Sequence, residues 1–131
     1  MRFLNTHHLL ALAICVALIT GCSESRDSLT EKMVTNLEDF NQVLSNITDM
    51  QSAKAAKPKL ETIGKELQNL KKRTDALPPP SAKEQQQIQA KYQTRMVNLM
   101  RNLMGTAMKL AMKPEIAEEL KEPMKSLQGL N

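Results

Sequence analysis

Apolar residues recur every three or four positions through most of residues 29–127, and this period is the strongest constraint on the fold. Such spacing places side chains on one face of an α-helix. The first two stretches carry Leu29, Met33, Leu37, Phe40, Leu44 and Ile47, then Ala53, Ala56, Leu60, Ile63, Leu67 and Leu70. The last two carry Ile88, Tyr92, Met96, Leu99, Leu103 and Leu110, then Ile116, Leu120, Met124 and Leu127. The pattern predicts an all-α domain of four amphipathic helices.

Polar caps and prolines separate these stretches and set the expected helix ends. Ser28, Asp49 and Ser81 precede three of them as N-cap residues, and Ser28 and Ser81 have the glutamate of a capping box three residues later. The three prolines at 78–80 form a stiff connection, and Pro114 suits the first position of the last helix. We predict a small antiparallel three-helix bundle with a short fourth C-terminal helix. The expected helices lie near residues 29–48, 52–75, 82–113 and 114–127.

Two residues interrupt the pattern of the second stretch. Pro58 removes one backbone hydrogen bond and crowds the preceding turn, so we expect a break or kink there. Gly64 lies on the apolar face. It either marks a close helix contact or is tolerated at a cost of about 1 kcal/mol.

An apolar run precedes the helical stretches. Leu9–Ile19 is uninterrupted, follows a weakly basic start that includes Arg2, and is too short to span a hydrocarbon core of about 30 Å. This organisation is typical of a secretory signal peptide. We therefore expect the run to be a targeting segment and exclude it from the fold.

The run closes on Ile19, Thr20, Gly21 and Cys22, which resemble the lipobox of bacterial lipoproteins. The resemblance implies cleavage between Gly21 and Cys22, a diacylglyceryl thioether on the Cys22 thiol and, commonly, acylation of the new amine. Two or more acyl chains are enough for stable anchoring. The alternative is an ordinary secretory signal with a chance cysteine near its end.

The residue after this cysteine bears on localisation. In Gram-negative lipoproteins an aspartate in that place commonly signals retention in the inner membrane, whereas this chain has Ser23. The resemblance therefore implies the periplasmic face of the outer membrane in a Gram-negative source, and the outer face of the plasma membrane in a Gram-positive one. The expected organisation is a signal peptide at 1–21, a lipidated cysteine with a short tether at 22–27, and a helical domain at 28–131.

Cleavage at this position would strip the chain of most catalytic and metal-binding groups. Cys15, His7 and His8 would be lost, leaving no disulfide, no histidine and no free thiol. The commonest zinc ligands and the usual nucleophile and base pairs are then absent. Two aromatic residues, Phe40 and Tyr92, are too few for a base-stacking platform. We expect no enzyme activity, no cofactor beyond the covalent lipid and no nucleic-acid partner.

Charge is shared unevenly among the expected helices. The net charge is −4 over residues 24–50, +5 over 51–73, +5 over 82–113 and −2 over 114–131. We interpret this as complementarity, with the acidic first and fourth helices flanking the basic second and third. The alternative is a surface for anionic headgroups or another polyanion. That surface would be formed by Lys54, Lys57, Lys71, Lys72 and Arg73.

A methionine series is the most unusual feature of the third helix. Met96, Met100, Met104, Met108 and Met112 recur at four-residue spacing. Each step advances by about 40° around the helix, so the series drifts across the surface. With neighbouring Val and Ala residues it gives the C-terminal half an apolar arc of roughly 200°, wider than one packing contact requires. Something other than one neighbouring helix must cover this arc.

Three interpretations of the series remain open. In the one we prefer, the C-terminal segment folds back so that Ile116, Leu120 and Leu127 meet the methionines as core. In the second, an exposed patch serves a protein partner or self-association. In the third, the thioethers hold a soft ion such as Cu(I). The residues of the possible partner-binding patch are Met100, Met104, Met108 and Met112.

The remaining candidates carry little chemistry. Glu115, Glu118, Glu119 and Glu122 suggest a cation cluster, but acidic residues in the first turns of a helix are favoured by its dipole, so we expect a solvated face. Residues 44–60 resemble only uncharacterised small secreted helical proteins. The sequence thus predicts a lipid-anchored, non-catalytic structural or protein-interaction module of the cell envelope, with a methionine-based Cu(I)-binding or metal-handling protein as the alternative.

Overall fold

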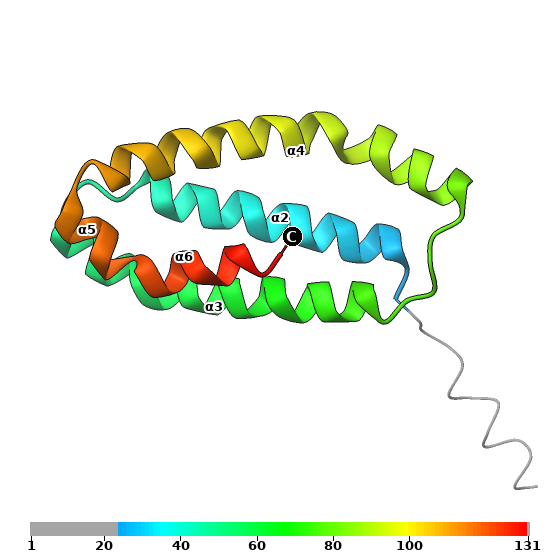
Figure 1. The fold of residues 1–131 in the computed structure, drawn as a ribbon, viewed down its shortest axis with the longest axis horizontal. Helices are drawn as coiled ribbons and strands as arrows, with labels where there is room; N and C mark the ends of the chain where they lie inside the picture. Colours follow the sequence, from blue (N-terminus) through cyan, green and yellow to red (C-terminus); the bar gives the residue numbers. More distant parts are fainter. Residues whose placement is uncertain (1–23, 131) are drawn as a thin grey trace, which may run out of the picture.

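The computed structural model describes residues 24–130, and the predicted signal segment and lipobox lie outside this range. The described part is almost entirely helical and has no strand, which confirms the predicted all-α class. Its helices are α2 Arg26–Ser45, α3 Met50–Asp75, α4 Ala82–Ala111, α5 Pro114–Glu119 and α6 Lys121–Gln128 (Figure 1).

The three long helices form an up-down-up bundle with α2 in the middle, so that α3 runs antiparallel to α2 and α4 runs parallel to it (Figure 1). Both α3 and α4 pack against α2, and within residues 24–130 they make no close backbone contact with each other. Figure 1 shows α5 crossing one end of the bundle and α6 returning along α3. The short C-terminal segment therefore covers α3 and leaves one side of α4 open.

The main core lies at the end of the bundle that α5 closes, and reaches to its middle. Phe40, Leu44 and Leu60 are fully buried there. The burial of each such side chain contributes roughly 1.5–3 kcal/mol. Leu29 and Val34 are also buried, towards the end where the chain enters α2, but they do not belong to this cluster. The entry end is thus packed less continuously than the closed end.

The N-terminal caps agree with the sequence at two of three places. The Asp49 carboxylate accepts the Ser52 N–H at 2.7 Å, and the Ser52 hydroxyl accepts the Asp49 N–H at 3.0 Å, forming a capping box. The hydrogen bond from the Ser52 N–H holds the pKa of Asp49 below its ordinary value. The predicted Ser81 cap is confirmed. The Ser28 cap is wrong, because α2 begins at Arg26 and the Ser25 hydroxyl accepts the Ser28 N–H instead.

Proline acts differently from expectation in α3 and in the C-terminal segment. The predicted break at Pro58 is wrong, because α3 continues through it; Pro58 is exposed, so its ring faces solvent. The expected helix at 114–127 is two helices that meet at Leu120. Pro123 explains why a new helix, α6, begins at Lys121. A proline has no N–H to continue a helix, but it is tolerated in the first turn of one.

Gly64 marks the close approach of α6 to α3. A Cβ atom on Gly64 would lie 2.1 Å from Ser126 Oγ and 2.7 Å from Ser126 Cβ. Both distances are shorter than any van der Waals contact, so only glycine fits beneath α6 as it stands. Of the two roles open for Gly64, the structure shows the close helix contact.

Candidate interaction surface

The methionines in the C-terminal half of α4 and at its C-cap, Met112, are exposed. The exposed fractions are 49% for Met100, 63% for Met104, 68% for Met108 and 84% for Met112. We call these four residues the methionine ridge. Only Met96, at the start of the series, is partly buried against the core.

The preferred interpretation of the series as core is therefore wrong. Ile116 and Leu120 are buried, but they pack into the main core at the end of the bundle and not over the ridge. Beyond Leu120, α6 runs along α3, where Gly64 admits it closely. The sequence showed that the apolar arc of α4 exceeds one packing contact, but not that the C-terminal segment prefers α3.

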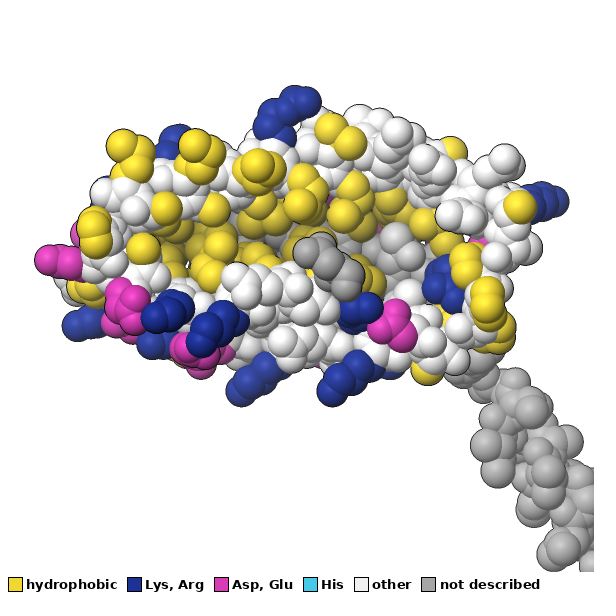
Figure 2. Space-filling model, viewed as in Figure 1, with side chains coloured by type: hydrophobic (Ala, Val, Ile, Leu, Met, Phe, Trp, Pro, Cys, Tyr) yellow, Lys and Arg dark blue, Asp and Glu magenta, His cyan; other side chains and the backbone are white. Residues whose placement is uncertain are grey.

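Beside the ridge, an apolar groove runs between α4 on one side and α2 and α6 on the other. Figure 2 shows apolar side chains gathered along this trough. One hollow, of about 390 Å³, is lined by residues that include Ala107, Leu110, Ala111, Leu120 and Met124. A second, of about 320 Å³, lies towards the chain entry and is lined by residues that include Met33, Val34, Leu37, Ile88, Tyr92 and Met96. The groove and the ridge together form an open apolar surface of the kind that marks an interaction site.

The charges that border the groove are all positive. Lys121 and Lys125 line the first hollow from α6, and no other charged side chain lines either hollow. Their ion-pair partners are Glu118 and Glu122, at 3.3 and 2.6 Å, and neither of these carboxylates lines the hollows. The groove therefore has an apolar floor and a cationic border.

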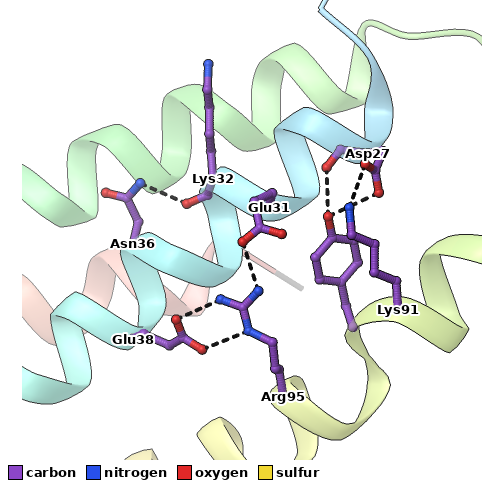
Figure 3. A network of polar contacts seen from close by, with 8 residues as sticks. Asp27, Glu31, Lys32, Asn36, Glu38, Lys91 and Arg95 are labelled. Carbon is purple, nitrogen blue, oxygen red and sulfur yellow. Dashed lines mark hydrogen bonds and ion pairs between the residues drawn. The ribbon is translucent and has the colours of Figure 1, made fainter.

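A polar layer between α4 and α2 holds the two helices together. Arg95 donates to Glu31 at 2.8 Å and to both carboxylate oxygens of Glu38 at 3.1 and 2.9 Å (Figure 3). Nearby, Lys91 Nζ lies 2.8 Å from Asp27, and the Tyr92 hydroxyl donates to the same aspartate at 3.1 Å. These contacts fix the position of α4 and so define one wall of the groove.

The same layer shifts the pKa values of its members. The hydrogen bond from Lys91 holds the pKa of Asp27 below its ordinary value, and that from Arg95 does the same for Glu31. The carboxylate partners raise the pKa of both Lys91 and Arg95. Burial raises the pKa of Tyr92. All five groups therefore keep their ordinary charge state at neutral pH.

Charge complementarity between helices accounts for much of the uneven charge. Asp27, Glu31 and Glu38 of the acidic α2 pair with the basic α4. Lys57 of the basic α3 lies 3.0 Å from Glu119 of α5. Within the alternative polyanion surface, Lys57, Lys71 and Arg73 have carboxylate partners, which leaves Lys54 and Lys72 as its members without one among residues 24–130. The predicted pairing of oppositely charged helices is confirmed, but the predicted order is not, because the acidic α2 lies between the basic α3 and α4.

The carboxylates of the C-terminal segment are also mostly paired. Glu118, Glu119 and Glu122 each pair with a lysine. In the part of the chain that the structure describes, no group of three or more His, Cys, Asp or Glu side chains is arranged to hold a metal ion. These carboxylates act in ion pairs at the surface.

The comparisons with known proteins assign no family to the chain. No family model matches it, and neither the curated proteins nor the solved structures include a match. Among residues 24–130, no helix is long and apolar enough to cross a membrane. The position of the predicted lipid-attachment residue, Cys22, is outside the described residues.

Sequence reasoning missed the second hollow and the polar layer. Met33 and Val34 of α2 form part of the wall of this hollow, whereas the apolar period had placed Met33 on the same helix face as Leu37 and Phe40. The signal for the polar layer was present in the sequence: Lys91 and Arg95 lie four residues apart in α4, as do Asp27 and Glu31 in α2. Two charged pairs with matched spacing on oppositely charged helices indicate that the helices lie side by side.

Proposed function

We propose that this chain is a lipid-anchored cell-envelope protein that acts as a non-catalytic interaction module. Two features support the proposal: the lipobox-like Ile19–Cys22, and the open apolar surface formed by the methionine ridge and the groove. The observation that carries the interaction role is the exposure of four consecutive ridge methionines on one helix. A monomeric protein gains nothing from this exposure, whereas flexible methionines suit a binding surface.

The proposed location follows from the residues around the anchor. With Ser23 after Cys22, the proposed site is the periplasmic face of the outer membrane in a Gram-negative cell, or the outer face of the plasma membrane in a Gram-positive cell. Residues 22–25 reach at most about 14 Å when extended. The helical domain would thus be held close to the bilayer, with a partner at or near the membrane.

Mass spectrometry of the native N-terminus, combined with membrane fractionation, tests the anchor. We expect a mature chain that begins at a lipidated Cys22 and sediments with membranes. A Cys22→Ser variant should keep its signal segment and lack the lipid, which provides the matched control. Recovery of the wild-type chain in the soluble fraction with an unmodified Cys22 would contradict the anchor.

Site-specific photo-crosslinking in intact envelopes tests the interaction surface. A photoreactive residue in place of Met104 should form a defined adduct, whereas the same residue in place of Asn98 should not. Both positions are exposed on α4, but Asn98 lies about 120° around the helix from Met104. Equal crosslinking from both positions, or none from either, would contradict a role for the ridge.

The alternative of Cu(I) binding is separated by titration. The ridge residues spread over about 120° of the surface of α4, so their four thioethers do not converge on one point. We expect no tight Cu(I) binding by the chain. Submicromolar binding that is lost in a Met100→Leu, Met104→Leu double variant would favour the metal-handling function instead.

A further inference from the structure

The groove along α4 is long enough to hold a helix, and the chain's own C-terminal helix fills only part of its length. α4 has 30 residues and α6 only 8, which correspond to about 45 and 12 Å of helix. The segment that returns from α5 therefore covers only a short part of the trough along α4. Beyond it, the second hollow is lined by Met33 and Leu37 of α2 and by Ile88 and Met96 of α4, and no helix among residues 24–130 lies across it.

The lining of this trough favours a helical occupant. The second hollow is apolar almost throughout, and the first is apolar apart from Gln128 and the two lysines at its border. An amphipathic helix buries one stripe of side chains in a groove while its backbone hydrogen bonds stay internal, so an apolar floor without backbone partners suffices. The neighbouring methionine ridge can adapt to such a helix because methionine side chains are flexible.

The positive charges at the border of the groove favour an occupant with negative charge. Lys121 and Lys125 are the charged side chains that line the groove, and α4 itself carries five basic residues and one acidic residue. A helix with acidic residues at the edges of its apolar face would meet Lys121 and Lys125, and opposite charges across an interface guide partner choice.

We propose that the groove binds an amphipathic α-helix of another protein, with its apolar face in the two hollows and with Asp and Glu on its flanks. This inference rests on the proposed function as an interaction module and specifies the chemistry of the partner. The helix would lie along α4, over α2 at the second hollow and beside α6 at the first.

Other occupants fit the groove less well. A second copy would bring one basic α4 against another or against the lysines of α6, and like charges repel. A flat bilayer would touch the ridge but not the recessed floor (Figure 2). An acyl chain in an open trough would keep much of its surface in water, whereas small-ligand sites bury most of the ligand.

Two synthetic peptides of about 24 residues test the proposal, because a helix of that length spans the stretch of α4 from Ile88 to Ala111. Both carry leucines at helical spacing with one tryptophan among them; one peptide has glutamates on its flanks and the other has lysines. The chain contains no tryptophan, so the emission reports the peptide alone. The full chain is reconstituted in neutral phosphatidylcholine vesicles, and vesicles without protein provide the blank.

We expect the acidic peptide to bind saturably, to gain helicity and to bind about tenfold or more tightly than the basic peptide. The acidic complex should weaken as salt is raised. Equal affinity for the two peptides, or no binding of the acidic one, would overturn the inference. Concentration-dependent dimerisation that displaces the acidic peptide, or groove-dependent binding to anionic vesicles, would overturn it as well.

Two charge-matched variants locate the binding. Gln93→Glu with Ala111→Glu adds two negative charges to groove-lining positions of α4, and Gln87→Glu with Asn98→Glu adds two on the far side of the same helix. Affinity for the acidic peptide should fall about tenfold in the groove variant and stay within about twofold in the control. Equal loss in both variants would overturn the assignment to the groove.

Failure of this inference differs from failure of the proposed function. If the chain stays with the vesicles and crosslinks from position 104 in envelopes but does not discriminate between the peptides, the partner chemistry is wrong and the module remains. If the wild-type chain is released from native membranes with an unmodified Cys22, the anchor is wrong whatever the peptides do.

Discussion

Replacement of Gly64 by alanine tests the packing of α6 most directly, because two known effects of similar size oppose each other. Alanine is favoured over glycine within a helix by about 1 kcal/mol. Against this, the new Cβ would lie 2.1 Å from Ser126 Oγ and 2.7 Å from Ser126 Cβ. The second distance involves an atom fixed to the backbone of α6, so rotation of the serine side chain cannot remove the overlap. α6 must shift away from α3.

Overpacking of this kind costs about 1–3 kcal/mol, which exceeds the gain in helix propensity. We therefore expect Gly64→Ala to lower the free energy of unfolding by about 1 kcal/mol. For a domain of this size the melting temperature would fall by about 4–8 °C. Urea and thermal denaturation followed by far-ultraviolet circular dichroism would measure both quantities.

Gly105→Ala is the matched control. Gly105 is exposed within α4, and a Cβ there would meet no atom within 4 Å. Alanine at Gly105 should therefore raise the free energy of unfolding by about 1 kcal/mol. In a Ser126→Gly background, which removes the overlapping atoms, Gly64→Ala should also become stabilising, with a coupling energy of about 2 kcal/mol. If Gly64→Ala stabilises the wild-type chain as much as Gly105→Ala does, α6 does not lie against α3 in this way.

Three further predictions address the ridge, the proline and the polar layer. Met108→Ala should change the free energy of unfolding by less than about 0.5 kcal/mol, because Met108 is 68% exposed. In the same urea titration, Leu103→Ala should lower it by about 2–5 kcal/mol, because Leu103 is only 7% exposed. Similar losses in the two variants would mean that the methionine ridge is part of the core. Pro58→Ala should raise the melting temperature, since an exposed proline inside a helix lowers the stability of the helix by up to about 3 kcal/mol. A lower melting temperature would show that Pro58 is required for the path of α3. Because the folded state lowers the pKa of Glu31, this carboxylate stabilises the fold above its ordinary pKa of 4.5, and the stabilisation is lost as pH falls through the lower folded value. Arg95→Met should flatten this acid dependence in urea titrations from about pH 6 to pH 2. An unchanged slope would contradict the pairing of Arg95 with Glu31.

Local patterns predicted the helices well, because their causes are local. The apolar period, the Asp49 cap and the three prolines at 78–80 act over a few residues, and each helix they define is present. The errors arose where two local signals competed. Ser28 was predicted as the first cap, but Ser25, three residues earlier, caps α2. Pro58 opposed a helix that runs for 26 residues and whose apolar face supplies part of the core.

The position of the C-terminal segment could not be predicted in the same way, because it depends on contacts between helices far apart in the chain. Ile116, Leu120 and Leu127 could have packed on the apolar arc of α4 or on the apolar face of α3, and periodicity does not distinguish the two. For the same reason, the groove could not be predicted from the sequence. Its walls are ordinary helix faces, and it exists only because the last helix lies elsewhere.

Gly64 gives this choice a physical cause. A glycine at the centre of the apolar face of α3 lets α6 approach until Ser126 reaches the position that a Cβ atom would occupy, whereas the methionine ridge of α4 presents long side chains that hold a neighbouring helix further away. Closer approach increases dispersion contacts between the helices, so α6 is stabilised more on α3 than it would be on the ridge. The same preference leaves the apolar arc of α4 uncovered within residues 24–130. The open groove is therefore a consequence of how this sequence packs its own last helix, and the residue that admits α6 to α3 also determines which face of α4 stays open.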